Sequence, residues 1–141
     1  MNKLYDQDYF AWTQDQADVL RRRSATEIDW DNLLDEVESL GRTQRRELHN
    51  RLVILLSHIL KWERQPELRS RSWSVTIATQ QKQIADLMEE SPSLKSALPE
   101  TYPKAYADAR DYASLETRIP VADFDRMAAL TFEEALSYAP S

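Results

Sequence analysis

Apolar residues recur every three or four positions along most of this chain, which is the spacing of one buried face of an α-helix. Prolines and short polar connectors separate the periodic segments. The pattern predicts an all-α fold, a helical bundle of four main helices with the third helix central, plus short C-terminal helices. The predicted helices cover residues 6–23, 29–40, 43–64, 72–90 and 104–116, with a short last helix from residue 131.

The third predicted helix carries the strongest pattern. Its apolar residues repeat at intervals of four and three, as in helices that pack closely against one another: Leu48, Leu52, Leu55, Ile59 and Trp62. Further apolar residues widen this seam, and a helix that apolar must be surrounded by other elements. We therefore expect the third helix to form the core.

The segment before it predicts a separate helix that ends at the only glycine of the chain. Asp29 is a suitable N-cap, and Gly41 follows the last apolar position, where a left-handed residue often ends a helix. The apolar residues between them predict a buried stripe: Trp30, Leu33, Leu34, Val37 and Leu40. We therefore expect a break at Gly41.

Composition narrows the possible classes of protein. A chain of 141 residues can bury a real core, and we expect a single helical domain over residues 1–141. The absence of cysteine excludes disulfides, thiolate nucleophiles and cysteine-ligated zinc, and one glycine excludes a glycine-rich phosphate loop. The first residues lack the pattern of a secretory signal, and no apolar run approaches the roughly 20 residues of a membrane span. We expect a cytoplasmic protein without a membrane partner.

The charge of the chain is unevenly distributed. The net charge of −6 argues against indiscriminate binding to nucleic acid. Residues 42–82, however, hold nine Lys and Arg against three acids, whereas the other residues hold nine against twenty-one. One basic region therefore lies in an otherwise acidic chain.

Two histidines, His49 and His58, share the third predicted helix and raise the question of a metal site. They are nine residues apart, close to half a turn out of phase at about 100° per residue, so we expect them on opposite sides of the helix. For His49 we favour a partly buried, hydrogen-bonded side chain over a metal ligand. No nucleophile or paired carboxylates stand out, so we assign no catalytic residue, no cofactor and no metal.

A group of acids precedes a group of arginines. Three acids lie on one side of the second predicted helix, and three arginines begin the third: Asp31, Asp35 and Glu38, then Arg42, Arg45 and Arg46. The acids have the oxygen ligands that a hard cation would use. We favour a structural acid–base seam between the two helices, because the acids otherwise repel one another.

Basic and aromatic residues surround the predicted loop between the third and fourth helices. The candidate contacts for a partner or a nucleic acid are Lys61, Arg64, Arg69 and Arg71, close to Trp62 and Trp73. Arginine and exposed tryptophan together suit phosphate contact, base stacking or an acidic partner. In the alternative interpretation both tryptophans belong to helix seams and the cations pair with acids of the same chain.

Several local patterns resemble a bacterial family catalogued as the domain of unknown function number twenty-nine. The matching segments span nearly the whole chain, and ESLGR at 38–42 is the most specific. The others are YDQDYFAW at 5–12, DWDNLLDEVESLGRTQRREL at 29–48, HILKW at 58–62, RSRSW at 69–73, SPSLK at 91–95 and AYADAR at 105–110. The resemblance implies a helical fold and a bacterial source. It implies no activity and therefore no functional residues.

Two functions remain open. We favour a non-catalytic interaction module whose helical surface binds a protein partner or a second copy of the chain. The alternative is a nucleic-acid-binding or regulatory protein that uses the basic region 42–73. Affinity for nucleic acid would fall steeply with salt, whereas an apolar protein interface would not.

Overall fold

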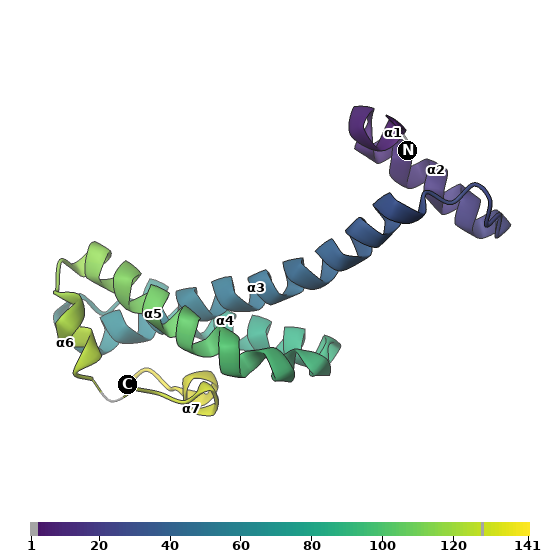
Figure 1. The fold of residues 1–141 in the computed structure, drawn as a ribbon. Coiled ribbons are helices and arrows are strands. Elements are labelled where there is room, and N and C mark those ends of the chain that lie inside the picture. The colour runs from purple at the N-terminus through teal and green to yellow at the C-terminus, as the bar shows by residue number, and fades with distance from the viewer. Residues whose placement is uncertain (1–2, 128) are drawn as a thin grey trace. The chain divides into compact units, whose positions relative to one another are not determined.

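The computed structural model describes residues 3–127 and 129–141, and all regular structure within them is helical. The helices are α1 (Lys3–Gln7), α2 (Tyr9–Arg22), α3 (Trp30–Arg64), α4 (Arg71–Glu90), α5 (Leu98–Thr117), α6 (Val121–Asp125) and α7 (Phe132–Ser137) (Figure 1). Short 3-10 helices, η1 (Pro66–Leu68) and η2 (Pro92–Ala97), precede α4 and α5. The predicted all-α fold is confirmed, with four long helices, α2 to α5.

The predicted break at Gly41 is wrong, because α3 runs without interruption for 35 residues from Trp30 to Arg64. A glycine inside a helix costs only about 1 kcal/mol relative to alanine, and strong helix formers such as Leu40 and Arg42 surround this one. The left-handed residues that do end helices are Arg23 after α2 and Arg118 after α5. The second and third predicted helices are therefore one helix.

Helix α5 is longer than predicted. It begins at Leu98 rather than at Lys104, with Pro99 in its first turn and Pro103 inside it. Proline is tolerated in a first turn because the N–H groups there have no partner within the helix. The capping box predicted for α7 is present, with Thr131 and Glu134 bonding reciprocally to each other's backbone N–H.

The chain divides into two compact units, residues 1–43 and residues 44–141. The prediction of a single domain is not tested by this division and stays a prediction. Among the described residues, no helix combines the length and apolar character that a membrane span requires.

Unit 44–141 contains the main core. The predicted seam residues Leu48, Leu52, Leu55 and Ile59 are at most 1% exposed, which agrees with a central role for this part of α3. They belong to one buried cluster with residues of the four following helices: Ile77, Ile84, Leu87, Ala105, Ala109, Ala113, Phe124 and Ala135. The alanines of α5 repeat every four residues, and their small side chains permit close helix packing.

Unit 1–43 has a much smaller core, in which Trp12 and Val19 of α2 are the buried apolar residues. The indole Nε1–H of Trp12 donates to Asp29 Oδ2 at 3.0 Å, and the backbone N–H of Asp29 donates to buried Gln16 at 2.8 Å. Burial alone would raise the pKa of Asp29, but hydrogen bonds from Asn32 and Trp12 outweigh it and hold that pKa below its usual value. These polar contacts fix the start of α3 against α2.

Candidate protein-interaction surface

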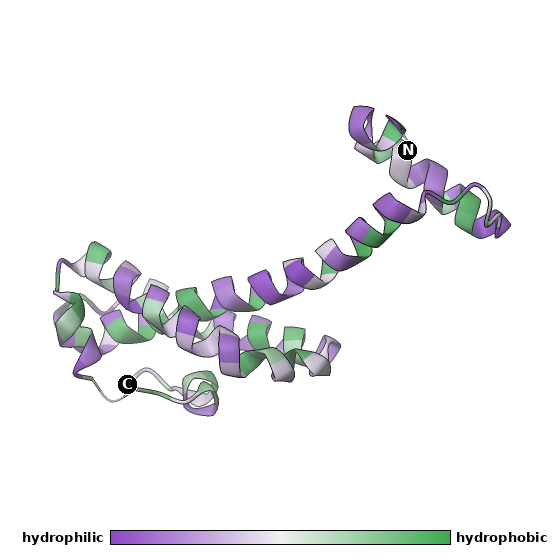
Figure 2. Ribbon diagram, viewed as in Figure 1, coloured by the Kyte–Doolittle hydropathy of each residue, from purple (hydrophilic) through white to green (hydrophobic). Residues whose placement is uncertain are grey.

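The stripe predicted to be core on residues 30–40 is exposed, so that prediction is wrong. Trp30, Leu34, Val37 and Leu40 are 61%, 58%, 57% and 67% exposed, while Leu33 is partly buried. At about 100° per residue, Trp30, Leu34 and Val37 lie within roughly 60° of one another on the helix surface. They form a narrow apolar face, with Leu40 beside its far end; Figure 2 shows apolar and polar residues interleaved along α3. These four residues are called the α3 stripe below.

In this unit the side of α3 that contacts other helices lies next to the α3 stripe and carries Glu36. The hydroxyls of Tyr5 and Tyr9 each donate to a carboxylate oxygen of Glu36 at 2.5 Å. These bonds lower the pKa of Glu36, and the same contact raises the pKa of Tyr5 to about 12. Tyr5 also packs edge-on against Trp12, with ring centroids 4.8 Å apart. The side of α3 that carries Glu36 and Asp29 therefore faces α1 and α2, and the stripe does not.

Acids line one edge of the α3 stripe. Asp31, Asp35 and Glu38 lie roughly 80–140° around the helix from Trp30. Within the described residues, Asp31 and Asp35 make no ion pair, and Glu38 pairs only at 4.0 Å with half-exposed Arg42. The stripe thus combines an apolar face with two carboxylates that nothing in the described chain neutralises.

The predicted acid–base seam between two helices does not exist in that form, because acids and arginines lie on the same continuous helix. Glu38 and Arg42 lie one helical turn apart. Exposed ion pairs at this spacing stabilise a helix by only a few tenths of a kcal/mol. Arg45 and Arg46 make no ion pair within the described residues. The acids and the arginines are therefore largely free to contact other molecules.

Most of the predicted basic contacts bind groups of this chain. Lys61 is 5% exposed, its ammonium lies 2.5 Å from Glu116, and it sits 5.1 Å from the centre of the Trp73 ring. Arg64 approaches Asp123 at 3.7 Å. Lys61 is thus a structural cation of unit 44–141, and Arg64 has an acid partner close by.

Arg69 also acts within the chain, whereas Arg71 does not. Arg69 donates to the backbone carbonyls of Trp62 and Ser141, and its guanidinium lies over the Trp62 ring at 5.0 Å. Arg71 is exposed at the start of α4, and its side chain has no hydrogen bond or ion pair within the described residues. Three of the four predicted basic residues thus contact groups of the same chain, and their role in binding a partner or a nucleic acid stays a prediction.

A surface hollow of about 790 Å³ lies between α3 and α5 in unit 44–141. Both histidines line it, and the α3 residues in its lining cover roughly half the helix circumference, with His49 at one end of that arc and His58 at the other. His49 Nε2 lies 2.8 Å from Asp108, and burial lowers the pKa of His58. The hydroxyl of nearby Ser57 donates to the Ile54 carbonyl, not to a histidine.

These contacts do not assemble a nucleophile with its base. Groups of three or more His, Cys, Asp or Glu able to hold a metal ion do not occur among the described residues. The lining of the hollow mixes polar with apolar side chains, and Ile54, Tyr112 and Leu115 in it are exposed. Sequence reasoning missed this surface because its two sides lie far apart in the chain.

A family model described as "Domain of unknown function DUF29" matches residues 4–139 of the chain. The resemblance noted in the sequence is therefore confirmed. No curated protein and no solved structure matches the chain.

Proposed function

The chain belongs to the DUF29 family, and we propose that it is a non-catalytic protein-interaction module that binds a partner helix on the α3 stripe. One observation carries the proposal: Trp30, Leu34, Val37 and Leu40 are all more than half exposed on one side of a helix. Contiguous exposed apolar faces of this kind mark interaction sites more often than isolated apolar residues do.

Unit 1–43, which carries the α3 stripe, buries few apolar side chains. Units of about 40 residues without disulfides or metals rarely bury enough apolar surface by themselves. Unit 1–43 buries Trp12 and Val19 but exposes the four stripe residues, and the chain has no cysteine. A partner on the stripe would complete the apolar burial that this unit lacks.

The charge beside the stripe supports a partner with basic residues. Asp31 and Asp35 are one turn apart, and like charges at this spacing destabilise a helix by a few tenths of a kcal/mol. Lys or Arg on a partner would relieve that repulsion, whereas a second acidic stripe would add to it. The occupant that fits is an amphipathic helix with basic residues beside its apolar face. The stripe runs for roughly 15 Å, so three to four turns of partner suffice.

The nucleic-acid alternative, using residues 42–73, draws less support. Lys61, Arg64 and Arg69 already contact Glu116, Asp123 and backbone carbonyls of the same chain. Nucleic-acid binding there would require these cations to exchange partners. The interaction-module proposal requires no such rearrangement.

Binding of two synthetic helices tests the proposal. One peptide carries a leucine stripe flanked by lysine and arginine, and the other carries glutamate at the flanking positions. Fluorescence anisotropy of the labelled peptides against the full chain measures both affinities. We expect saturable binding of the basic peptide and at least about tenfold weaker binding of the acidic one.

Matched variants locate the binding. Leu34→Ser with Val37→Ser should abolish it, whereas Leu68→Ser with Val75→Ser, equally exposed at 55% each, should leave it intact. Asp31→Asn with Asp35→Asn should weaken binding, whereas removal of two exposed acids at the end of α4, Glu89→Gln with Glu90→Gln, should not. Equal losses in a variant and its control would refute the assignment to the stripe. Self-association of the chain that depends on Leu34 would replace the basic helix with a second copy as occupant.

A further inference from the structure

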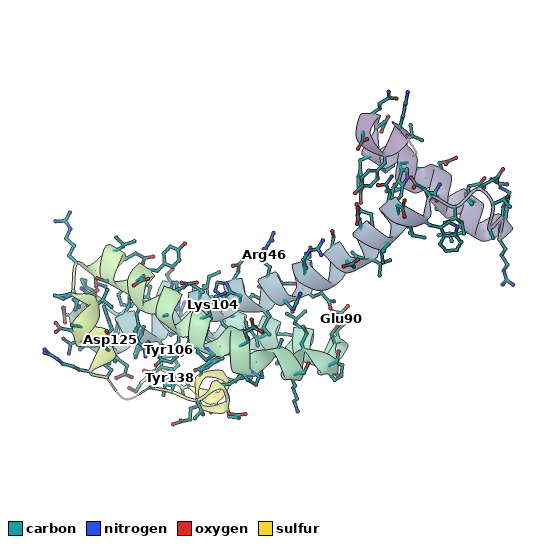
Figure 3. All side chains as sticks on the ribbon, viewed as in Figure 1. Arg46, Glu90, Lys104, Tyr106, Asp125 and Tyr138 are labelled. Atoms are coloured by element: carbon teal, nitrogen blue, oxygen red, sulfur yellow. The ribbon has the colours of Figure 1, made fainter. Side chains whose placement is uncertain are left out.

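A separate hollow of about 390 Å³ lies on unit 44–141, beside the first turns of α5. Three cations reach it from two helices, Arg45 and Arg46 from α3 and Lys104 from α5. Figure 3 labels one of them on each helix, Arg46 and Lys104. The rest of the lining is Ala97, a single acid and three polar residues: Glu100, then His49, Ser96 and Thr101.

The three cations lack acid partners. The side chain of none of them makes a hydrogen bond or ion pair within the described residues. Most other cations of the unit do pair with acids: Arg51, Lys61, Arg64, Lys82, Arg110 and Arg126. In a chain with an excess of acids, three uncompensated cations around one hollow form a local positive site.

We propose that this hollow binds a small phosphate-bearing molecule. Three cations and one acid leave a formal charge of +2, which matches a phosphate dianion. The guanidinium groups of Arg45 and Arg46 offer paired N–H donors that fit phosphate oxygens, and Lys104 supplies a point charge from the opposite helix. The hydroxyl of Thr101 adds a neutral hydrogen-bond donor on the α5 side.

The size of the hollow favours a small ligand. Its volume lies at the lower end of the roughly 300–1,000 Å³ typical of small-molecule sites, enough for one or two phosphate groups with a small organic part. The three cations converge on this hollow instead of forming a long basic track like those that follow a nucleic-acid backbone. The site uses no residue of the α3 stripe, so it is independent of the proposed interaction function.

Isothermal titration of the full chain with inorganic pyrophosphate tests the site. We expect saturable binding with one site per chain. Arg46→Gln combined with Lys104→Gln should weaken it at least about tenfold, because each removes a charged hydrogen-bond donor. The matched control is Arg71→Gln with Lys95→Gln, which removes two exposed, unpaired cations that do not line this hollow.

The single acid gives a test in the opposite direction. Glu100→Gln should tighten pyrophosphate binding severalfold, because it removes a repulsive charge from the lining without removing a donor. Equal weakening by the site variant and its control would overturn the proposal in favour of non-specific charge attraction. A short single-stranded RNA that binds where pyrophosphate does not would overturn it in favour of nucleic acid.

Discussion

Truncation should destabilise the protein far more at one leucine of α3 than at another. Leu55 of α3 is fully buried in the core cluster, whereas Leu34 of the α3 stripe is 58% exposed. Leu55→Ala removes buried methyl groups and leaves a cavity, which costs about 2–5 kcal/mol of unfolding free energy. Burying a whole leucine side chain contributes about 1.5–3 kcal/mol, so the part of Leu34 that is buried contributes about 1 kcal/mol. Leu34→Ala should therefore cost no more than that.

Urea denaturation followed by far-ultraviolet circular dichroism measures both free energies. The wild type and the two variants should have similar slopes against denaturant, with a much lower midpoint for Leu55→Ala. A Leu34→Ala variant that loses more than about 2 kcal/mol would refute the reasoning, since only a core residue loses that much. A near-neutral Leu55→Ala would show that the seam of α3 is not the core.

Three further predictions follow from single residues. Gly41→Ala should stabilise the protein by about 0.5–1 kcal/mol in thermal unfolding, because Gly41 is inside a helix with open space around it; a glycine cap would give a loss instead. Burial lowers the pKa of His58, with Lys61 adding to this and Glu116 opposing it. As the pH falls, His58 is therefore protonated at a higher pH in the unfolded chain than in the folded one. Stability should then fall as the pH drops below about 6.5, and His58→Gln should flatten that dependence in denaturation series at several pH values. Thr131→Ala should lower the unfolding free energy by about 1 kcal/mol in urea denaturation, because it removes the capping box of α7. Thr131→Ser should keep most of that stability, because its hydroxyl can accept the same hydrogen bond.

Local sequence patterns predicted the features of the fold that depend on local chemistry. The apolar residues between Leu48 and Trp62 recur at intervals of four and three, which predicts one apolar face along several turns. That face is buried. The Thr131 capping box was also predicted, because its two hydrogen bonds join residues three apart. Gly41 was misread because a glycine permits a left-handed cap but does not require one, and the flanking residues favour helix.

Features that depend on distant residues were not predictable. Periodicity shows which side of α3 is apolar, but it does not show whether the covering element belongs to the same chain, so the α3 stripe was placed in the core. Nothing in the local pattern indicated that Lys61 pairs with Glu116, because Glu116 lies 55 residues further along the chain. His49 and Asp108 are 59 residues apart, and Arg46 and Lys104 meet at one hollow only after α3 and α5 pack.

The absence of cysteine permits the most direct measurement of the central claim, that the α3 stripe is an open surface for a basic partner helix. A single Val37→Cys variant should react with a maleimide as fast as a Val75→Cys control of equal exposure, and much faster than Leu55→Cys. Adding the basic amphipathic peptide should slow only the Val37→Cys reaction. A thiol at position 37 that is unreactive in the free chain, or one that the peptide leaves unprotected, would contradict the account.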